Sequence, residues 1–129
     1  MQATDNIQSG IVGTNVVSPV SKPLFIKDGR KLLHIVKHHV VYLTSDGHVC
    51  NLYMKGRRAP IVHSESLKNL ARKLGDVLTK VRRGLAVNMH YVTSIEDGAL
   101  KLAWDDQEAE LAYSKDNYKN ILSAIDLLE

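Results

Sequence analysis

Residues 40–54 read VVYLTSDGHVCNLYM, two apolar runs on either side of the dipeptide Asp46-Gly47. The runs are rich in β-branched and aromatic residues, which favour strands. Asp-Gly favours a tight hairpin turn because glycine readily adopts a positive φ. The stretch therefore predicts a β-hairpin with His48 at its tip.

The same signal recurs on both sides of this hairpin. Asp28-Gly29 separates LFIK from KLLHIV, and Asp97-Gly98 separates YVTSI from LKLAW. A further turn, Lys55-Gly56-Arg57, leads into the short run APIV. Short strands spaced about 8–12 residues apart are typical of an antiparallel all-β body.

Two segments carry the apolar spacing of helices instead. In residues 66–75, SLKNLARKLG, apolar residues recur at i, i+3, i+4 and i+7, with Ser64 or Ser66 as the N-cap and Gly75 as the stop. Residues 118–125 repeat the spacing, with Ser114 as a cap. The predicted fold is mainly β: antiparallel sheets built from hairpins, one short internal helix and a C-terminal helix.

Length and composition predict one globular domain. The chain has 129 residues, of which 44% are hydrophobic, and it lacks the roughly 18 consecutive apolar residues of a membrane span. Residues 1–23 lack periodicity and contain two of the three prolines, so we expect a linker or disordered tail there and a domain over residues 24–129. The start lacks the features of a secretory signal, and a single Cys cannot form an internal disulfide, so we expect a cytoplasmic protein.

Charge is distributed unevenly along the chain, although the net charge is only +3. Residues 55–83 carry nine basic side chains against two acidic ones, a balance of +7. Residues 96–129 carry three against nine, a balance of −6. This asymmetry indicates one face suited to a polyanion. The alternative is that the charges only coat solvated surfaces.

The histidines and the cysteine do not predict an enzyme. His38 and His39 are adjacent, so in a strand they would point to opposite faces and could not share a metal. Cys50 lies in mid-strand without a local activating partner, and no GxSxG, P-loop or GxGxxG motif is present. We therefore expect no catalytic residue, no metal and no cofactor.

The ordered series of motifs resembles the LytTR DNA-binding domain, found mainly at the C-terminus of bacterial response regulators. The resemblance spans about residues 24–125. It is carried by LFIKDGRKLLHI, VVYLTSDGHVCNLYM, the helix SLKNLARKL, the stretch KVRRGLAVN followed by MHYVTSIE, and the late pair Ser114-Lys115.

Several positions depart from the family pattern. Lys80 stands where the family usually has Arg, Arg82 where it has His, Gly84 for Ser, and Leu85 for an aromatic residue. Lys115 replaces the usual Arg. The positive charges are kept, but the change to glycine removes a hydroxyl that could hold a phosphate.

The resemblance implies sequence-specific binding of double-stranded DNA by loops at the sheet ends, which would enter the grooves. Arg83 is predicted to contact a base, because a guanidinium can pair with guanine O6 and N7. His48 could donate to a base edge or be an ordinary turn residue. Lys115 matches the third reading loop, although a lysine lacks the bidentate fork of arginine and should discriminate less.

Contacts to phosphates fix register without reading sequence. Ser66 could instead be only a helix cap, and the two arginines of the 55–58 turn could instead blunt a sheet edge against aggregation. The predicted phosphate contacts are Lys80, Arg82, Ser66, Ser114, Arg57 and Arg58.

The resemblance further implies a regulator of transcription in a two-component-type system. Its partners would be promoter DNA, a second copy on paired direct repeats, and a receiver domain in a full-length protein, with no membrane. The alternative is a β-rich protein-interaction module whose basic patch holds an acidic partner protein. Single-stranded nucleic-acid binding by a small barrel is a third option, but it needs stacking aromatics, and the chain has one Phe and one Trp.

Overall fold

The computed structural model describes residues 22–129, so the linker predicted for residues 1–23 lies outside them except for its last two residues. The strands are β1 (Leu24–Asp28), β2 (Lys31–Ile35), β3 (Val40–Asp46), β4 (Val49–Met54), β5 (Ile61–His63), β6 (Thr79–Arg82), β7 (Leu85–Val87), β8 (Val92–Glu96), β9 (Ala99–Trp104) and β10 (Gln107–Ala112). The α-helices are α1 (Leu67–Leu74) and α2 (Tyr118–Ser123). Short 3-10 turns are η1 (Lys37–His39), η2 (Gly75–Val77), η3 (Met89–Tyr91) and η4 (Lys115–Asn117).

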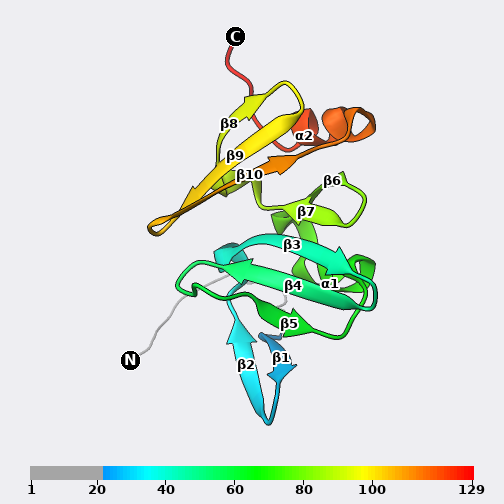
Figure 1. Cartoon of the computed structure of the whole chain (residues 1–129), viewed down its shortest axis with the longest axis vertical. Helices are drawn as coiled ribbons and strands as arrows, with labels where there is room; N and C mark the ends of the chain where they lie inside the picture. Colours follow the sequence, from blue (N-terminus) through cyan, green and yellow to red (C-terminus); the bar gives the residue numbers. More distant parts are fainter. Residues whose placement is uncertain (1–21) are drawn as a thin grey trace, which may run out of the picture.

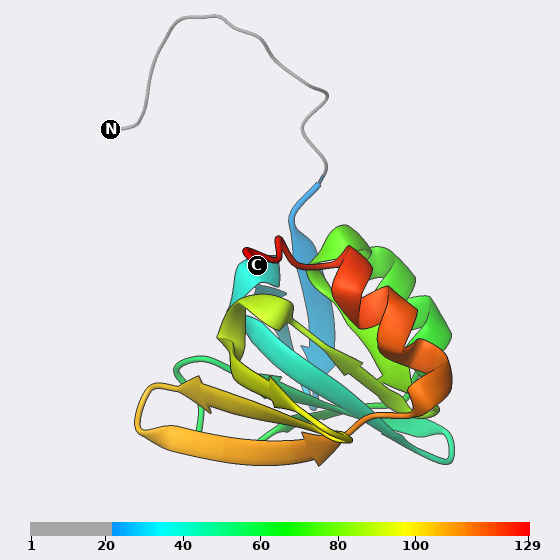
Figure 2. The same cartoon turned by 90° about the horizontal axis from the view of Figure 1, so that it is seen from above.

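The strands form three antiparallel units stacked along the long axis of the molecule (Figure 1). A five-stranded sheet in the order β5-β4-β3-β7-β6 lies in the middle, between the β1–β2 hairpin and a three-stranded sheet in the order β10-β9-β8. Seen from above, the two helices (green and orange-red) lie on the same side of the strands (Figure 2). The predicted mainly-β fold with an internal and a C-terminal helix is confirmed.

Three predicted hairpins are present, and three further strands have a weaker sequence signal. The turns at Asp28-Gly29, Asp46-Gly47 and Asp97-Gly98 join β1 to β2, β3 to β4 and β8 to β9. Strands β6 and β7 form a further hairpin inside the basic stretch, where the pattern predicts only the entrance to an apolar run. Strand β10, QEAELA, is not predicted, because it has no β-branched or aromatic residue, although its polar and apolar residues alternate as in a half-buried strand.

Strand β3 is buried on both faces and separates two apolar clusters. Val40 and Leu43 belong to one cluster, whereas Val41 and Tyr42 belong to the other. A register irregularity between Val40 and Tyr42 lets two consecutive side chains face the same cluster. The first cluster includes Leu52, Ile61, Leu70 and Leu74, and the second includes Val81, Leu85, Leu100, Leu102 and Ile121.

Helix α1 begins and ends where its sequence predicts. The Ser66 hydroxyl accepts a hydrogen bond from the backbone N–H of Asn69 at 3.1 Å, so Ser66 is the N-cap. The C-cap is Gly75, with φ +67. Leu70 and Leu74 are buried against the first apolar cluster, which fixes the helix on the five-stranded sheet.

Asn88 is a buried polar residue, with 1% of its surface exposed, at the end of β7. Its side-chain amide donates to the carbonyl oxygen of Val40 at 2.9 Å, and its Oδ1 accepts from the backbone N–H of His90 at 3.0 Å. Its own backbone N–H donates to the carbonyl of Val41 at 2.8 Å. Asn88 thus joins the end of β7 to the start of β3 and begins η3.

Replacing Asn88 with leucine should destabilise the fold by about 2–3 kcal/mol, because the Val40 carbonyl and the His90 N–H would be left buried without partners. Urea denaturation followed by circular dichroism measures the change. The control is Asn51→Ala, since Asn51 makes a single side-chain bond, 3.3 Å long, to Thr44. Equal losses in the two variants would contradict the role given to Asn88.

Candidate nucleic-acid interface

Three segments distant in the sequence meet at one side of the molecule, on the right in Figure 1. They are the end of β3 with the β3–β4 turn (45–48), the end of β6 with the β6–β7 turn (81–84), and the pair Ser114-Lys115 before α2. The backbone N–H of Ser45 donates to the carbonyl of Gly84 at 2.9 Å, and that of Ser114 donates to the carbonyl of Val81 at 2.9 Å. We call these three bonded segments the loop edge.

Gly84 completes the β6–β7 turn at φ +77. A tight hairpin turn needs a positive φ, which glycine adopts without strain. A Cβ at this position would lie 3.7 Å from the Ser45 carbonyl oxygen, an ordinary contact. Backbone conformation, and not lack of space, is therefore the reason for glycine here.

The variant Gly84→Ala should lose about 1 kcal/mol of unfolding free energy, because the left-handed conformation strains an alanine. Gly84→Asn is the matched variant and should lose less, since asparagine tolerates this conformation better. Thermal unfolding of both proteins compares the two costs. A smaller loss for alanine than for asparagine would contradict this explanation.

The basic residues of β6 and its turn point in different directions. Arg82 Nε donates to the carbonyl of Ala112 at 3.0 Å and so ties β6 to the end of β10. Lys80 and Arg83 instead line a groove between β6–β7 and α1. An irregular register between Lys80 and Arg82 separates their side chains, as a β-bulge does.

This groove, which we call the basic groove, has a volume of about 860 Å³. Two of its cations, Lys68 and Arg72, come from α1 and were missed as site residues. Their i, i+4 spacing on the polar face of the predicted helix is a signal that could have found them. The lining is Ser45, Leu67, Lys68, Ala71, Arg72, Leu78, Lys80, Arg83, Gly84 and Ala86.

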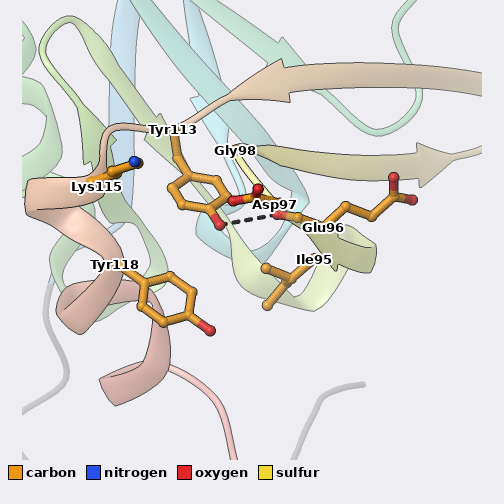
Figure 3. Close-up of a pocket in the computed structure, with 7 residues that line it drawn as sticks. All are labelled: Ile95, Glu96, Asp97, Gly98, Tyr113, Lys115 and Tyr118. Carbon is orange, nitrogen blue, oxygen red and sulfur yellow. Dashed lines mark hydrogen bonds between the residues drawn. The ribbon is translucent and has the colours of Figure 1, made fainter.

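Lys115 lies in a more acidic setting than the other loop-edge cations (Figure 3). It lines a hollow of about 520 Å³ together with Glu96 and Asp97 of the β8–β9 turn. The Tyr113 hydroxyl donates to the carbonyl of Glu96 at 2.9 Å, and the Tyr113 ring stacks on that of Tyr118 at 5.8 Å. The final strand and α2 are thereby held against the β8–β9 turn.

The predicted cap of the C-terminal helix is wrong in detail. Ser114 lies one turn before α2, at the start of η4, and its hydroxyl donates to Oδ1 of Asn117 at 2.6 Å. No backbone N–H of the helix is bonded by its side chain. Because η4 intervenes, α2 begins at Tyr118 and its N-cap residue is Asn117.

His48 and Ser66 lie on the same side of the molecule as the β6–β7 turn. His48 is exposed in the two-residue turn after Asp46. The thiol of Cys50, whose strand partner is Ser45, donates to the carbonyl of Glu65 at 3.0 Å, which places the start of α1 beside the β3–β4 hairpin.

Arg57 and Arg58 lie elsewhere, at the opposite end of the β3–β4 hairpin from the loop edge, on the left in Figure 1. Their turn packs against the β9–β10 turn. The Gly56 N–H donates to Asp105 Oδ2 at 2.6 Å, Gln107 Nε2 donates to the Arg57 carbonyl at 3.2 Å, and Arg58 forms an ion pair with Asp106. The structure therefore places Arg57 and Arg58 away from the other seven residues that were predicted to contact bases or phosphates.

Cys50, the single cysteine of the chain, is a buried core residue. Burial raises the pKa of the Cys50 thiol and Glu65 raises it further, so the thiol stays protonated near neutral pH. Within residues 22–129 no three His, Cys, Asp or Glu side chains are grouped so as to hold a metal ion. In the same part of the chain, no helix has the length and apolar character needed to cross a bilayer.

Comparison with known proteins agrees with this architecture. The family model described as the LytTr DNA-binding domain matches residues 30–126. A similar solved structure is described as the LytTr DNA-binding domain of a response regulator from Bacillus cereus. It has a TM-score of 0.59 and 14% sequence identity, and the match covers 81% of this chain and 97% of that one. No curated protein matched the sequence. The family match spans most of the chain, and the chain therefore belongs to the LytTR family of DNA-binding domains.

Proposed function

We propose that the chain binds double-stranded promoter DNA in a sequence-specific manner through the loop edge, and so regulates transcription. The observation that supports this most is that Arg83, His48 and Lys115 belong to three separate segments that backbone hydrogen bonds bring to one side of the molecule. A duplex has grooves spaced along its axis that such a row of loops can enter. Membership of a DNA-binding family supports the same conclusion.

The proposed division of labour follows the chemistry of each side chain. Arg83 reads a guanine through paired bonds to O6 and N7, while His48 and Lys115 each offer single donors to base edges. Lys80 and Arg82 hold phosphates and release condensed counterions. Ser66 would assist through the first backbone N–H groups of α1, since its hydroxyl already caps the helix. Ser114, whose backbone N–H is bonded to the Val81 carbonyl, would turn its hydroxyl from Asn117 to a phosphate. Arg57 and Arg58 have no part in this proposal.

The wider setting is proposed from the family. The chain would act in the cytoplasm of a bacterium as the output domain of a two-component system, coupled to a receiver domain in a full-length protein. Two copies would occupy paired direct repeats. We assign no enzymatic activity to it. The alternative, an acidic protein partner held by the same cations, predicts no DNA-dependent complex in analytical ultracentrifugation.

Selection of bound sequences from random duplexes would supply the target, and Arg83→Ala should then weaken binding to it. We expect a loss of about 1–3 kcal/mol, with relaxed preference at one base pair, because one bidentate contact is removed. Fluorescence anisotropy at fixed salt, with the selected duplex and with duplexes changed at single base pairs, measures the loss of affinity and the change in base preference. Arg58→Ala is the matched control and should leave the affinity within about twofold, since Arg58 lies away from the loop edge. Equal effects of the two substitutions would refute this arrangement.

Lys80→Gln should act differently, because a phosphate contact carries no sequence information. We expect weaker binding to selected and random duplexes alike. The slope of log affinity against log salt should also become shallower by roughly 0.9, the value for one lost phosphate contact. An unchanged slope would show that Lys80 does not touch the DNA backbone.

A further inference from the structure

The basic groove combines two features that a DNA contact does not need together. Its rim carries four cations, Lys68, Arg72, Lys80 and Arg83, and its lining residues include no Asp or Glu. Among the described residues, the ion pairs involve other side chains than these four. Cations gathered in this way repel one another, and an anion placed among them relieves the repulsion.

The floor of the groove is apolar. It is formed by Leu67, Ala71 and Leu78, which are half-buried, and by the buried Ala86. A phosphodiester gains nothing from such a floor, because its contacts require donors and positive charge. An apolar ligand without charge would in turn gain nothing from the four rim cations. The surface is complementary to a molecule that has both parts.

We propose that the basic groove binds a small amphipathic carboxylate, with its apolar body over Ala71 and its anionic group among the rim cations. The volume of about 860 Å³ lies in the range of roughly 300–1,000 Å³ that small-molecule sites occupy. The groove adds a ligand site on the α1 side of the β6–β7 hairpin, and its floor residues are not among the DNA contacts proposed above.

The consequence of this site rests on the proposed function. Lys80 and Arg83 line the groove and are also proposed to touch the duplex. A bound carboxylate would occupy both cations, so ligand and DNA would compete. Coupling between two ligands is reciprocal, so the duplex must weaken carboxylate binding by the same factor.

Direct binding is measured first, without DNA, by calorimetric titration of the full chain. Decanoate supplies both parts of the ligand. Acetate has the charge alone, and decyltrimethylammonium has the chain with the opposite charge. Decanoate should bind at least tenfold more tightly than either comparator at equal ionic strength. If acetate binds with the same affinity as decanoate, the groove recognises only the anionic group. If decyltrimethylammonium binds with the same affinity, the rim cations play no part in binding. Either result overturns the proposal.

Three variants of α1 locate the site. Ala71→Trp fills the floor without removing a charge and should weaken decanoate binding more than tenfold. Lys68→Gln removes one rim cation and should cost roughly two- to fivefold, as for an exposed ion pair. Lys73→Gln is the matched control, because Lys73 lies on the same helix but binds Glu65 at 3.1 Å, outside the groove. Unfolding curves identify any variant that fails to fold. Decanoate binding unaffected by both Ala71→Trp and Lys68→Gln would overturn the proposal.

The competition is measured by anisotropy of a labelled duplex. Decanoate should displace the duplex from the native chain. The Ala71→Trp variant should bind the duplex with an affinity within about threefold of that of the native chain. Decanoate should not displace the duplex from this variant. Displacement from both proteins would overturn the shared-cation mechanism. If the native chain binds decanoate but no duplex, the proposed DNA-binding function is refuted and the proposed carboxylate site is retained. If it binds the duplex but not decanoate, only the carboxylate site is refuted.

Discussion

Strand β3 is buried on both faces, and the placement of every functional segment follows from that burial. It pairs with β4 on one side and with β7 on the other, while Val40 and Leu43 face one apolar cluster and Val41 and Tyr42 face the other. The irregular register near Val41 divides those side chains between the clusters. A slip of one residue would turn Val40 and Leu43 from the first cluster toward the second, so the packing of both clusters fixes the register of the strand.

The fixed register of β3 decides what reaches the loop edge. Because β4 and β7 are both antiparallel to β3, the turns that precede Val49 and Leu85 must lie at the same end of the sheet. The bond from Ser45 to Gly84 closes the gap between them, and the bond from Ser114 to Val81 adds the third segment. The same antiparallel geometry sends the turn after Met54 to the far end, where Arg58 meets Asp106.

Much of the architecture could be predicted because its signals are local. Asp-Gly pairs mark three of the hairpins, and the spacing of Leu67, Leu70 and Leu74 marks α1 between a serine cap and a terminal glycine. Strands that are not bounded by an Asp-Gly turn were harder to predict from the sequence. Strand β10 alternates glutamates with Ala109 and Leu111 but has no β-branched or aromatic residue, and its identity as a strand depends on pairing with β9. The β6–β7 turn is similarly hidden within a basic stretch.

By itself, the sequence determined the class of fold and the residue types suited to a polyanion, because hydrophobic periodicity, turn chemistry and charge are properties of neighbouring residues. The family was indicated by the resemblance of its ordered motifs, which also lie in the sequence alone. Only the tertiary structure decided which cations act together. Arg57 and Arg83 are equally basic in the sequence, yet strand pairing sends them to opposite ends of the sheet. Lys68 and Arg72 join Lys80 and Arg83 around one groove because α1 packs beside the β6–β7 hairpin. These contacts are between residues far apart in the chain, which no local pattern specifies.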